Sequence, residues 1–115
     1  MNKINVKGLA LDDLKGRKFK LWDYNVSHSW LLIRSPRNKS LGHEQNIDLL
    51  FGAVHHMELT KELDNISITE ESYDHYYTKY VIDSEQGQYA VIAGLCNIRL
   101  SDKHIFDSPL DRILR

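Results

Sequence analysis

Apolar and polar side chains alternate near the start of the chain, in the run F-K-L-W-D-Y of residues 19–24. Phe19 and Leu21 are separated by lysine, which is the two-residue period of a half-buried β-strand. Turn-forming residues follow at 25–29, and W-L-L-I-R then continues with aromatic and branched side chains. The pattern therefore predicts a β-hairpin.

A longer extended segment follows at residues 46–59, N-I-D-L-L-F-G-A-V-H-H-M-E-L. It exceeds ordinary strand length, so we expect a bulge or bend at residues 52–53, where glycine interrupts the run. Successive side chains of a strand point to opposite faces. We therefore expect His55 to face the core, and His56 and Glu58 to face the other way.

The tyrosine-rich run S-Y-D-H-Y-Y-T-K-Y, residues 72–80, fits two structures. Its tyrosines have helical spacing, and Thr69 with the following glutamates could start a helix. Yet the residues are strong β-formers, and S-E-Q-G-Q before Y-A-V-I-A-G-L is typical of a hairpin turn. We favour a hairpin from Tyr76 to about Leu100, with any helix confined to residues 69–75. The apolar residues 91–95 predict a central strand.

Two short helical segments complete the predicted elements. Residues 9–15 can form one turn with Leu11 and Leu14 inward, ended by Gly16. Residues 108–111, S-P-L-D, have the serine cap and first-position proline of a helix start. Together the elements predict a mainly β fold in a single domain, residues 1–115. It is an antiparallel sheet, a sandwich or half-open barrel, with one or two short helices; the alternative is α+β.

Composition narrows the class of protein further. The chain of 115 residues is 42% hydrophobic and 27% charged, as in ordinary globular domains. Its single cysteine, Cys96, excludes an internal disulfide, and we expect that thiol to pack as a small hydrophobe. No apolar leader or membrane-spanning run is present, so we expect a cytoplasmic protein. The run H-S-W-L-L-I-R-S-P is similar to those of small bacterial proteins, which suggests a bacterial host.

Charge is distributed unevenly along the chain. Residues 1–45 carry nine Lys/Arg against four Asp/Glu, whereas residues 46–90 carry two against nine. The acidic part contains the tyrosine cluster, and tyrosine is enriched in protein-binding surfaces. The leading hypothesis is thus a non-enzymatic protein-binding module, in its sharpest form an immunity-type protein that neutralises a basic toxin domain. The candidate partner-binding residues are Glu70, Glu71, Tyr73, Asp74, Tyr76, Tyr77 and Tyr80.

Other functions remain as alternatives. His56 and Glu58 could begin a metal site or a small catalytic centre with distant histidines, although no zinc or nucleophile motif is present and we expect no cofactor. The basic and aromatic strands of residues 17–39 could bind single-stranded nucleic acid. The near-neutral net charge of −1 and the acidic middle of the chain argue against that partner. A homodimer through an exposed strand edge is also possible.

Overall fold

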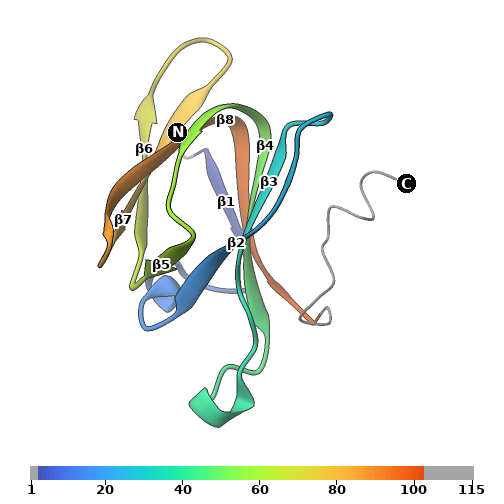
Figure 1. The fold of residues 1–115 in the computed structure, drawn as a ribbon, viewed down its shortest axis with the longest axis vertical. Helices are drawn as coiled ribbons and strands as arrows, with labels where there is room; N and C mark the ends of the chain where they lie inside the picture. Colours follow the sequence, from blue (N-terminus) through green and yellow to red (C-terminus); the bar gives the residue numbers. More distant parts are fainter. Residues whose placement is uncertain (1–2, 103–115) are drawn as a thin grey trace.

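The chain forms one curled, mostly antiparallel sheet with the shape of a half-barrel (Figure 1). This computed structural model describes residues 3–102, and strands account for 64% of them. The elements are β1 (Ile4–Lys7), the 3-10 helix η1 (Leu11–Leu14), β2 (Lys18–Asn25), β3 (Trp30–Ser35), the 3-10 helix η2 (Lys39–Leu41), β4 (Asn46–Glu58), β5 (Glu62–Asp64), β6 (Ser67–Ser72), β7 (Thr78–Ser84) and β8 (Gly87–Ser101). The predicted mainly β fold is confirmed. Within the described residues the helices are 3-10 turns only, so the α+β alternative is wrong.

Strands β4 and β8 form the centre of the sheet, whose order is β5-β2-β3-β4-β8-β7-β6. They pair antiparallel along the length of β4. On its other side β8 pairs first with β7, through residues 87–93, and then in parallel with β1, through residues 96–99. The predicted hairpins are confirmed, as is the central position of residues 91–95.

Two glycines permit the sharp bend in the middle of β4 and β8 (Figure 1). A β-carbon added at Gly52 would lie 3.0 Å from the side chain of Leu95. A β-carbon added at Gly94 would lie equally close, 3.0 Å, to that of Ala53. Larger residues at these positions would push the two strands apart, so the glycines allow the sheet to curl.

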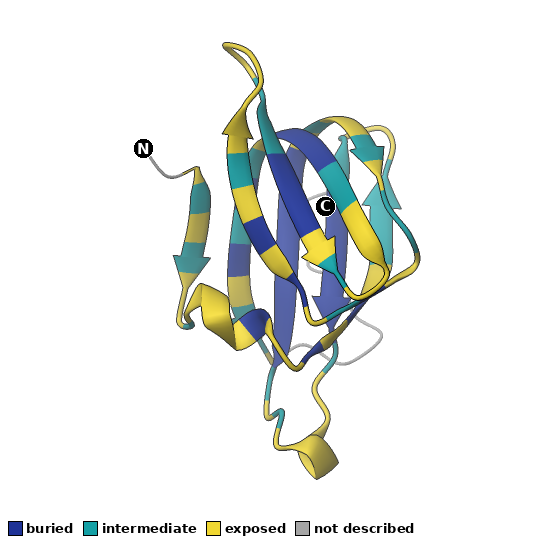
Figure 2. Ribbon diagram, turned by 90° about the vertical axis from the view of Figure 1, so that its left-hand side faces the viewer, coloured by how far each residue is buried: buried dark blue, intermediate teal, exposed yellow. Residues whose placement is uncertain are grey.

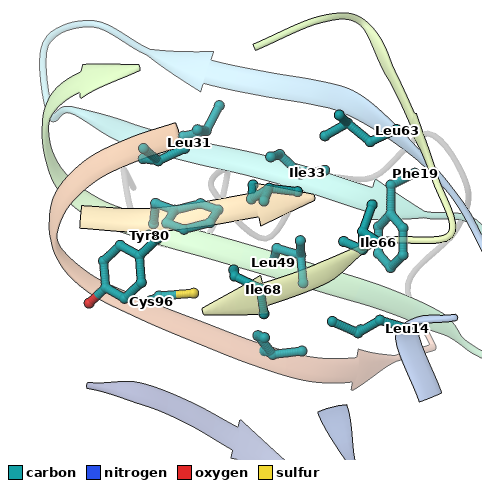
Figure 3. Packing of buried hydrophobic residues seen from close by; sticks show 14 of the residues in the cluster. Leu14, Phe19, Leu31, Ile33, Leu49, Leu63, Ile66, Ile68, Tyr80 and Cys96 are labelled. Carbon is teal, nitrogen blue, oxygen red and sulfur yellow. The ribbon is translucent and has the colours of Figure 1, made fainter. Parts of the chain in front are cut away.

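The main hydrophobic core fills the inner face of the half-barrel (Figures 2 and 3). Leu31 and Ile33 of β3 point into it, as the strand period requires. Leu14 of η1 is buried beside Phe19 and Ile66 at one end of the core (Figure 3), whereas Leu11 is exposed. The inward turn predicted for residues 9–15 is therefore confirmed for Leu14 and wrong for Leu11.

The outer face carries a second, smaller cluster over β3 and β4. Leu32 and Leu50 are buried there, with the half-buried Trp22 and Trp30 packed against them. Strand β3 is therefore buried on both faces. Such a strand has little freedom to slip, because a shift by one residue would exchange its two apolar sets.

An ion pair lies between β3 and β4, next to this outer cluster. Arg34 Nε donates to Asp48 Oδ1 at 2.7 Å, and Arg34 Nη2 donates to Asp48 Oδ2 at 3.2 Å. Both side chains are fully buried, and the Arg34 guanidinium carbon lies 5.3 Å from the centre of the Trp22 ring. The two residues are register partners, so the strand pairing itself brings the charges together.

The tyrosine run forms no helix. Residues 69–75, predicted as the site of any helix, end β6 and begin the loop before β7. Ile68 is buried while Ser67 and Thr69 are exposed, which is the alternation of a strand, and β6 pairs with β7 along its whole length. A helix there would lose those pairings, so tertiary context overrides the helical spacing of the tyrosines. The helix start predicted at residues 108–111 lies outside the described residues.

Candidate functional site

The loop between β6 and β7 is a compact turn built around Asp74. Asp74 Oδ1 accepts hydrogen bonds from the backbone N–H groups of Tyr76, at 2.9 Å, and Tyr77, at 2.8 Å. The carbonyl of Tyr77 accepts a further bond from the N–H of Asp74 at 3.2 Å. Aspartate often closes turns in this way, because its short side chain reaches nearby backbone donors. Asp74, a predicted binding residue, therefore supports the loop.

Three tyrosines and one histidine form an aromatic cluster at this turn, here named the tyrosine tip (Tyr73, Tyr76, Tyr77 and His55). The rings of His55 and Tyr77 stack with centroids 4.6 Å apart and an interplanar angle of 16°. Tyr76 meets Tyr77 edge-on at 6.5 Å, and Tyr73 lies 6.3 Å from His55. Tyr76 is 81% exposed and Tyr73 49% exposed. The loop projects from one end of the molecule (Figure 1), and Tyr77 is the only half-buried member of the cluster.

His55 reaches the tyrosine tip because β4 contains a β-bulge. The β4–β8 register shifts between Val54 and His56, so His55 is an extra residue without a partner on β8. Both histidines are exposed, whereas Val54 and Met57 pack against the core. The prediction that His55 faces the core is therefore wrong, because the extra residue changes the alternation. The bend predicted at residues 52–53 is confirmed, and the register shift of the bulge follows it between Val54 and His56.

The two glutamates near the tip differ in their partners: Glu70 is held by backbone hydrogen bonds, whereas Glu71 forms only a long, exposed ion pair. Glu70 Oε2 accepts hydrogen bonds from the backbone N–H groups of Lys3, at 2.6 Å, and Ile4, at 2.9 Å. Glu70 therefore fastens β6 to the start of β1. Glu71 Oε2 lies 3.9 Å from Lys79 Nζ, and the two side chains are 61% and 42% exposed. Solvent weakens such a pair, so a partner can still reach the charge of Glu71.

A hollow of about 190 Å³ lies beside the tip, between β6 and the start of β1. Its ionisable lining is mostly acidic: Glu70, Glu71 and Asp74, with Lys3 and Tyr77. The structure thus gathers the predicted acidic residues and three of the predicted tyrosines at one end of the sheet. The arrangement combines negative charge with exposed aromatic area, and both features are common in surfaces that bind basic proteins.

Tyr80 does not belong to this surface. It is fully buried and meets Phe51 edge-on, with ring centroids 5.6 Å apart. Its hydroxyl has no hydrogen-bond partner within residues 3–102, and Figure 3 shows the Tyr80 ring near Cys96. Burial, then Cys96 and Glu70, raise the pKa of Tyr80. This burial corrects the prediction of Tyr80 as a binding residue, because β7 turns its side chain into the half-barrel.

The alternative metal site has no third ligand among the described residues. His56 and Glu58 share the outer face of β4, as their spacing predicts, opposite Ile92 and Ala90 of β8. Within residues 3–102, no group of three or more His, Cys, Asp or Glu side chains is placed to hold a metal ion. Zinc sites in proteins take three or four protein ligands, so the pair alone does not make such a site.

The tryptophans of the predicted nucleic-acid surface are engaged in packing. Trp22 and Trp30 cover the outer cluster described above, and Trp22 also lies over Arg34. Their rings are therefore only partly available for stacking on bases. Lys18 and Lys20 of β2, in contrast, are exposed.

Cys96 offers no reactive thiol. It is buried in the main core between β4 and β1, its register partners on either side. Burial, followed by the charge of Glu70, raises the pKa of the thiol far above its usual range. A thiol that stays protonated is a poor nucleophile, so the packing role predicted for Cys96 accounts for its environment.

Comparisons with known proteins identify no relative of this chain. No family model, no curated protein and no solved structure matches the chain. In residues 3–102 there is no helix both long and apolar enough to cross a membrane. Sequence reasoning missed one member of the tip, His55, whose only signal was its position after Gly52 and Ala53 in an overlong strand.

Proposed function

We propose that this chain is a non-enzymatic protein-binding module, whose tyrosine tip binds a basic surface of another protein. The observation that carries the proposal is the exposed aromatic area of Tyr73 and Tyr76 on a turn held by Asp74. Tyrosine brings a large contact area with few torsions to immobilise, which lowers the entropic cost of binding. The hydrogen-bonded turn lowers that cost further, because the loop is already shaped before the partner arrives.

The charge around the tip supports a basic partner. Glu71 is exposed beside the tip, and Glu70 and Asp74 line the adjoining hollow. Complementary charge speeds the encounter of two proteins and disfavours partners of the wrong sign. The sharpest form of the proposal is an immunity-type protein of the bacterial cytoplasm, which covers a cationic toxin domain.

The test is native mass spectrometry of the protein isolated gently from its own host. We expect a basic chain in stoichiometric complex with the wild-type protein, and its loss from the double variant Tyr73→Ser/Tyr76→Ser. The matched control is Val26→Ser, which removes an exposed apolar side chain from the β2–β3 loop. A partner that stays bound to the double variant, or that is acidic, would contradict the proposal.

The electrostatic part has a separate test once a partner is in hand. Glu71→Lys should slow association and leave dissociation nearly unchanged, because steering by an exposed charge acts mainly on the encounter. Surface plasmon resonance at low and high salt measures both rates. Glu70 and Asp74 are unsuitable for this test, since their substitution also removes hydrogen bonds that hold β1 and the turn. An unchanged association rate would contradict the electrostatic part of the proposal, and only the tyrosine contacts would then support binding.

A further inference from the structure

A second hollow, of about 280 Å³, opens between β2 and the loop that joins β3 to β4. Every ionisable side chain that lines it is basic: Lys18, Lys20, Arg37 and His43. Leu41 and Pro36 add an apolar wall, and Leu41 is 64% exposed. This basic pocket lies near the loop with η2, at the opposite end of the molecule from the β6–β7 loop (Figure 1).

The pocket is formed by backbone that is held on both sides. Lys18 and Lys20 flank the buried Phe19, so both leave the same outer face of β2. On the other side, the backbone groups of Asn38 and His43 exchange hydrogen bonds at 2.8 and 3.0 Å, which closes the loop. The basic side chains therefore come from two separate elements and converge on one hollow.

A buried arginine adds positive charge next to the pocket. Arg17 is 8% exposed and donates to Ser35 Oγ at 2.9 Å, to the Ser35 carbonyl at 3.2 Å and to the Gln45 carbonyl at 2.8 Å. All three acceptors are neutral, and no carboxylate of the described residues forms an ion pair with it. Burial, followed by the charge of Arg17, lowers the pKa of His43. The pocket thus lies in a positive local field.

Two carboxylates lie across the sheet from the lysines of the pocket. Glu62 and Asp64 of β5 stand opposite Lys20 and Lys18 in the sheet. Neither forms an ion pair with these lysines within residues 3–102, and neither lines the pocket. Asp64 instead accepts a hydrogen bond from the side chain of Gln86 at 2.9 Å. Within the described residues, an anion would therefore not have to break an ion pair to reach these two lysines.

We propose that the basic pocket binds an organic phosphate, with the phosphate on Lys18, Lys20 and Arg37 and the organic group against Leu41 and Pro36. Phosphate suits this lining because it accepts several charge-assisted hydrogen bonds at once. The volume of about 280 Å³ lies just below the roughly 300–1,000 Å³ of small-molecule sites, so a mononucleotide or a smaller phosphate ester is the right size. A free nucleotide and a nucleic-acid strand share this chemistry. The site is independent of the tyrosine tip.

The test is an NMR and calorimetric titration of the isotope-labelled full chain with inorganic phosphate, adenosine monophosphate and a short oligothymidylate. We expect the nucleotide to shift the backbone amide signals of residues 16–20, 35 and 37–43. It should also raise the pKa of His43, since bound negative charge favours the imidazolium. Lys20→Gln and Arg37→Gln should each weaken binding roughly tenfold, the loss expected for one charge-assisted hydrogen bond.

The control is Lys61→Gln, which removes the same charge from an exposed lysine outside the pocket. An equal loss of affinity in Lys61→Gln would show diffuse attraction and overturn the proposal, as would absence of shifts around the pocket with nucleotide and phosphate. Tighter binding of the oligothymidylate, with shifts at Trp22 and Trp30, would identify a strand as the source of the phosphate. Equal or tighter binding of the nucleotide would identify a free ligand. Neither outcome bears on the tyrosine tip.

Discussion

The two ends of the half-barrel use their charged residues in different ways. At the tyrosine tip, the ion pair of Glu71 with Lys79 is largely exposed, so it contributes little to stability. Next to the β3–β4 loop, the ion pair of Arg34 with Asp48 is fully buried, and Arg17 is buried as well. The charge of Glu71 at the tip is therefore not committed to the structure, whereas the buried charges at the other end maintain it. The comparison separates an exposed charge, whose substitution should leave stability nearly unchanged, from buried charges, whose substitution should lower it.

The largest effect is expected for Asp48→Ala, which leaves the charge of Arg34 buried without its carboxylate. Breaking a buried pair from one side costs about 3–5 kcal/mol, so the free energy of unfolding measured in urea should fall by that amount. The double variant Arg34→Met/Asp48→Leu is the control, because it removes both charges and should recover most of the loss. If Asp48→Ala lowered the free energy of unfolding by less than about 1 kcal/mol, the buried pair would contribute no more than an exposed one. The two ends of the half-barrel would then not differ in this respect.

A smaller effect is expected for Asp74→Ala at the tip. The variant loses two exposed hydrogen bonds to the turn, which together are worth about 1 kcal/mol of unfolding free energy. Amide exchange should accelerate at Tyr76 and Tyr77 and stay unchanged in β4. Asp83→Ala on β7, whose carboxylate accepts one bond from Gln88, serves as the control with a loss below about 0.5 kcal/mol. Equal losses in the two variants would mean that Asp74 does not organise the turn.

The smallest effect is expected for Glu71→Gln. Its salt bridge is long and exposed, so the free energy of unfolding should change by less than about 0.5 kcal/mol. Thermal unfolding at low and high salt measures this difference, with Lys79→Gln as the reciprocal control. A loss of several kcal/mol, reduced by salt, would show that the acidic end also depends on its charges for stability. The two ends would then differ in how far their charges are buried, but not in how much those charges contribute to stability.

Much of the fold follows from the two-residue period of the sequence. The alternation around Phe19 and the apolar run at residues 91–95 identified a half-buried and a central strand, because burial on one or two faces leaves different patterns. The face of His55 could not be predicted in the same way. A bulge inserts one residue into the count, and its position depends on the pairing with β8, which the local sequence does not contain.

The candidate site was predictable only in part, for a similar reason. The sequence grouped four tyrosines, but the structure exposes Tyr76 and buries Tyr80, since the end of the loop decides where the β7 alternation begins. The buried ion pair had a weak signal, as Arg34 and Asp48 each interrupt or end an apolar run. Opposite charges at facing positions of two strands become recognisable only when the register is known.

The parallel pairing of β1 with β8 has a consequence for the order of assembly. Ile4 pairs with Cys96, so β1 is synthesised long before β8, the strand with which it pairs. Contacts between such distant residues are formed late and slow the folding of a chain, because a long loop must close first. Until β1 docks, Glu70 also lacks the two hydrogen bonds that the backbone N–H groups of Lys3 and Ile4 donate to it. A nascent chain therefore exposes the edge of β8 until β1 docks, and this is the step at which we expect the protein to be most prone to aggregation.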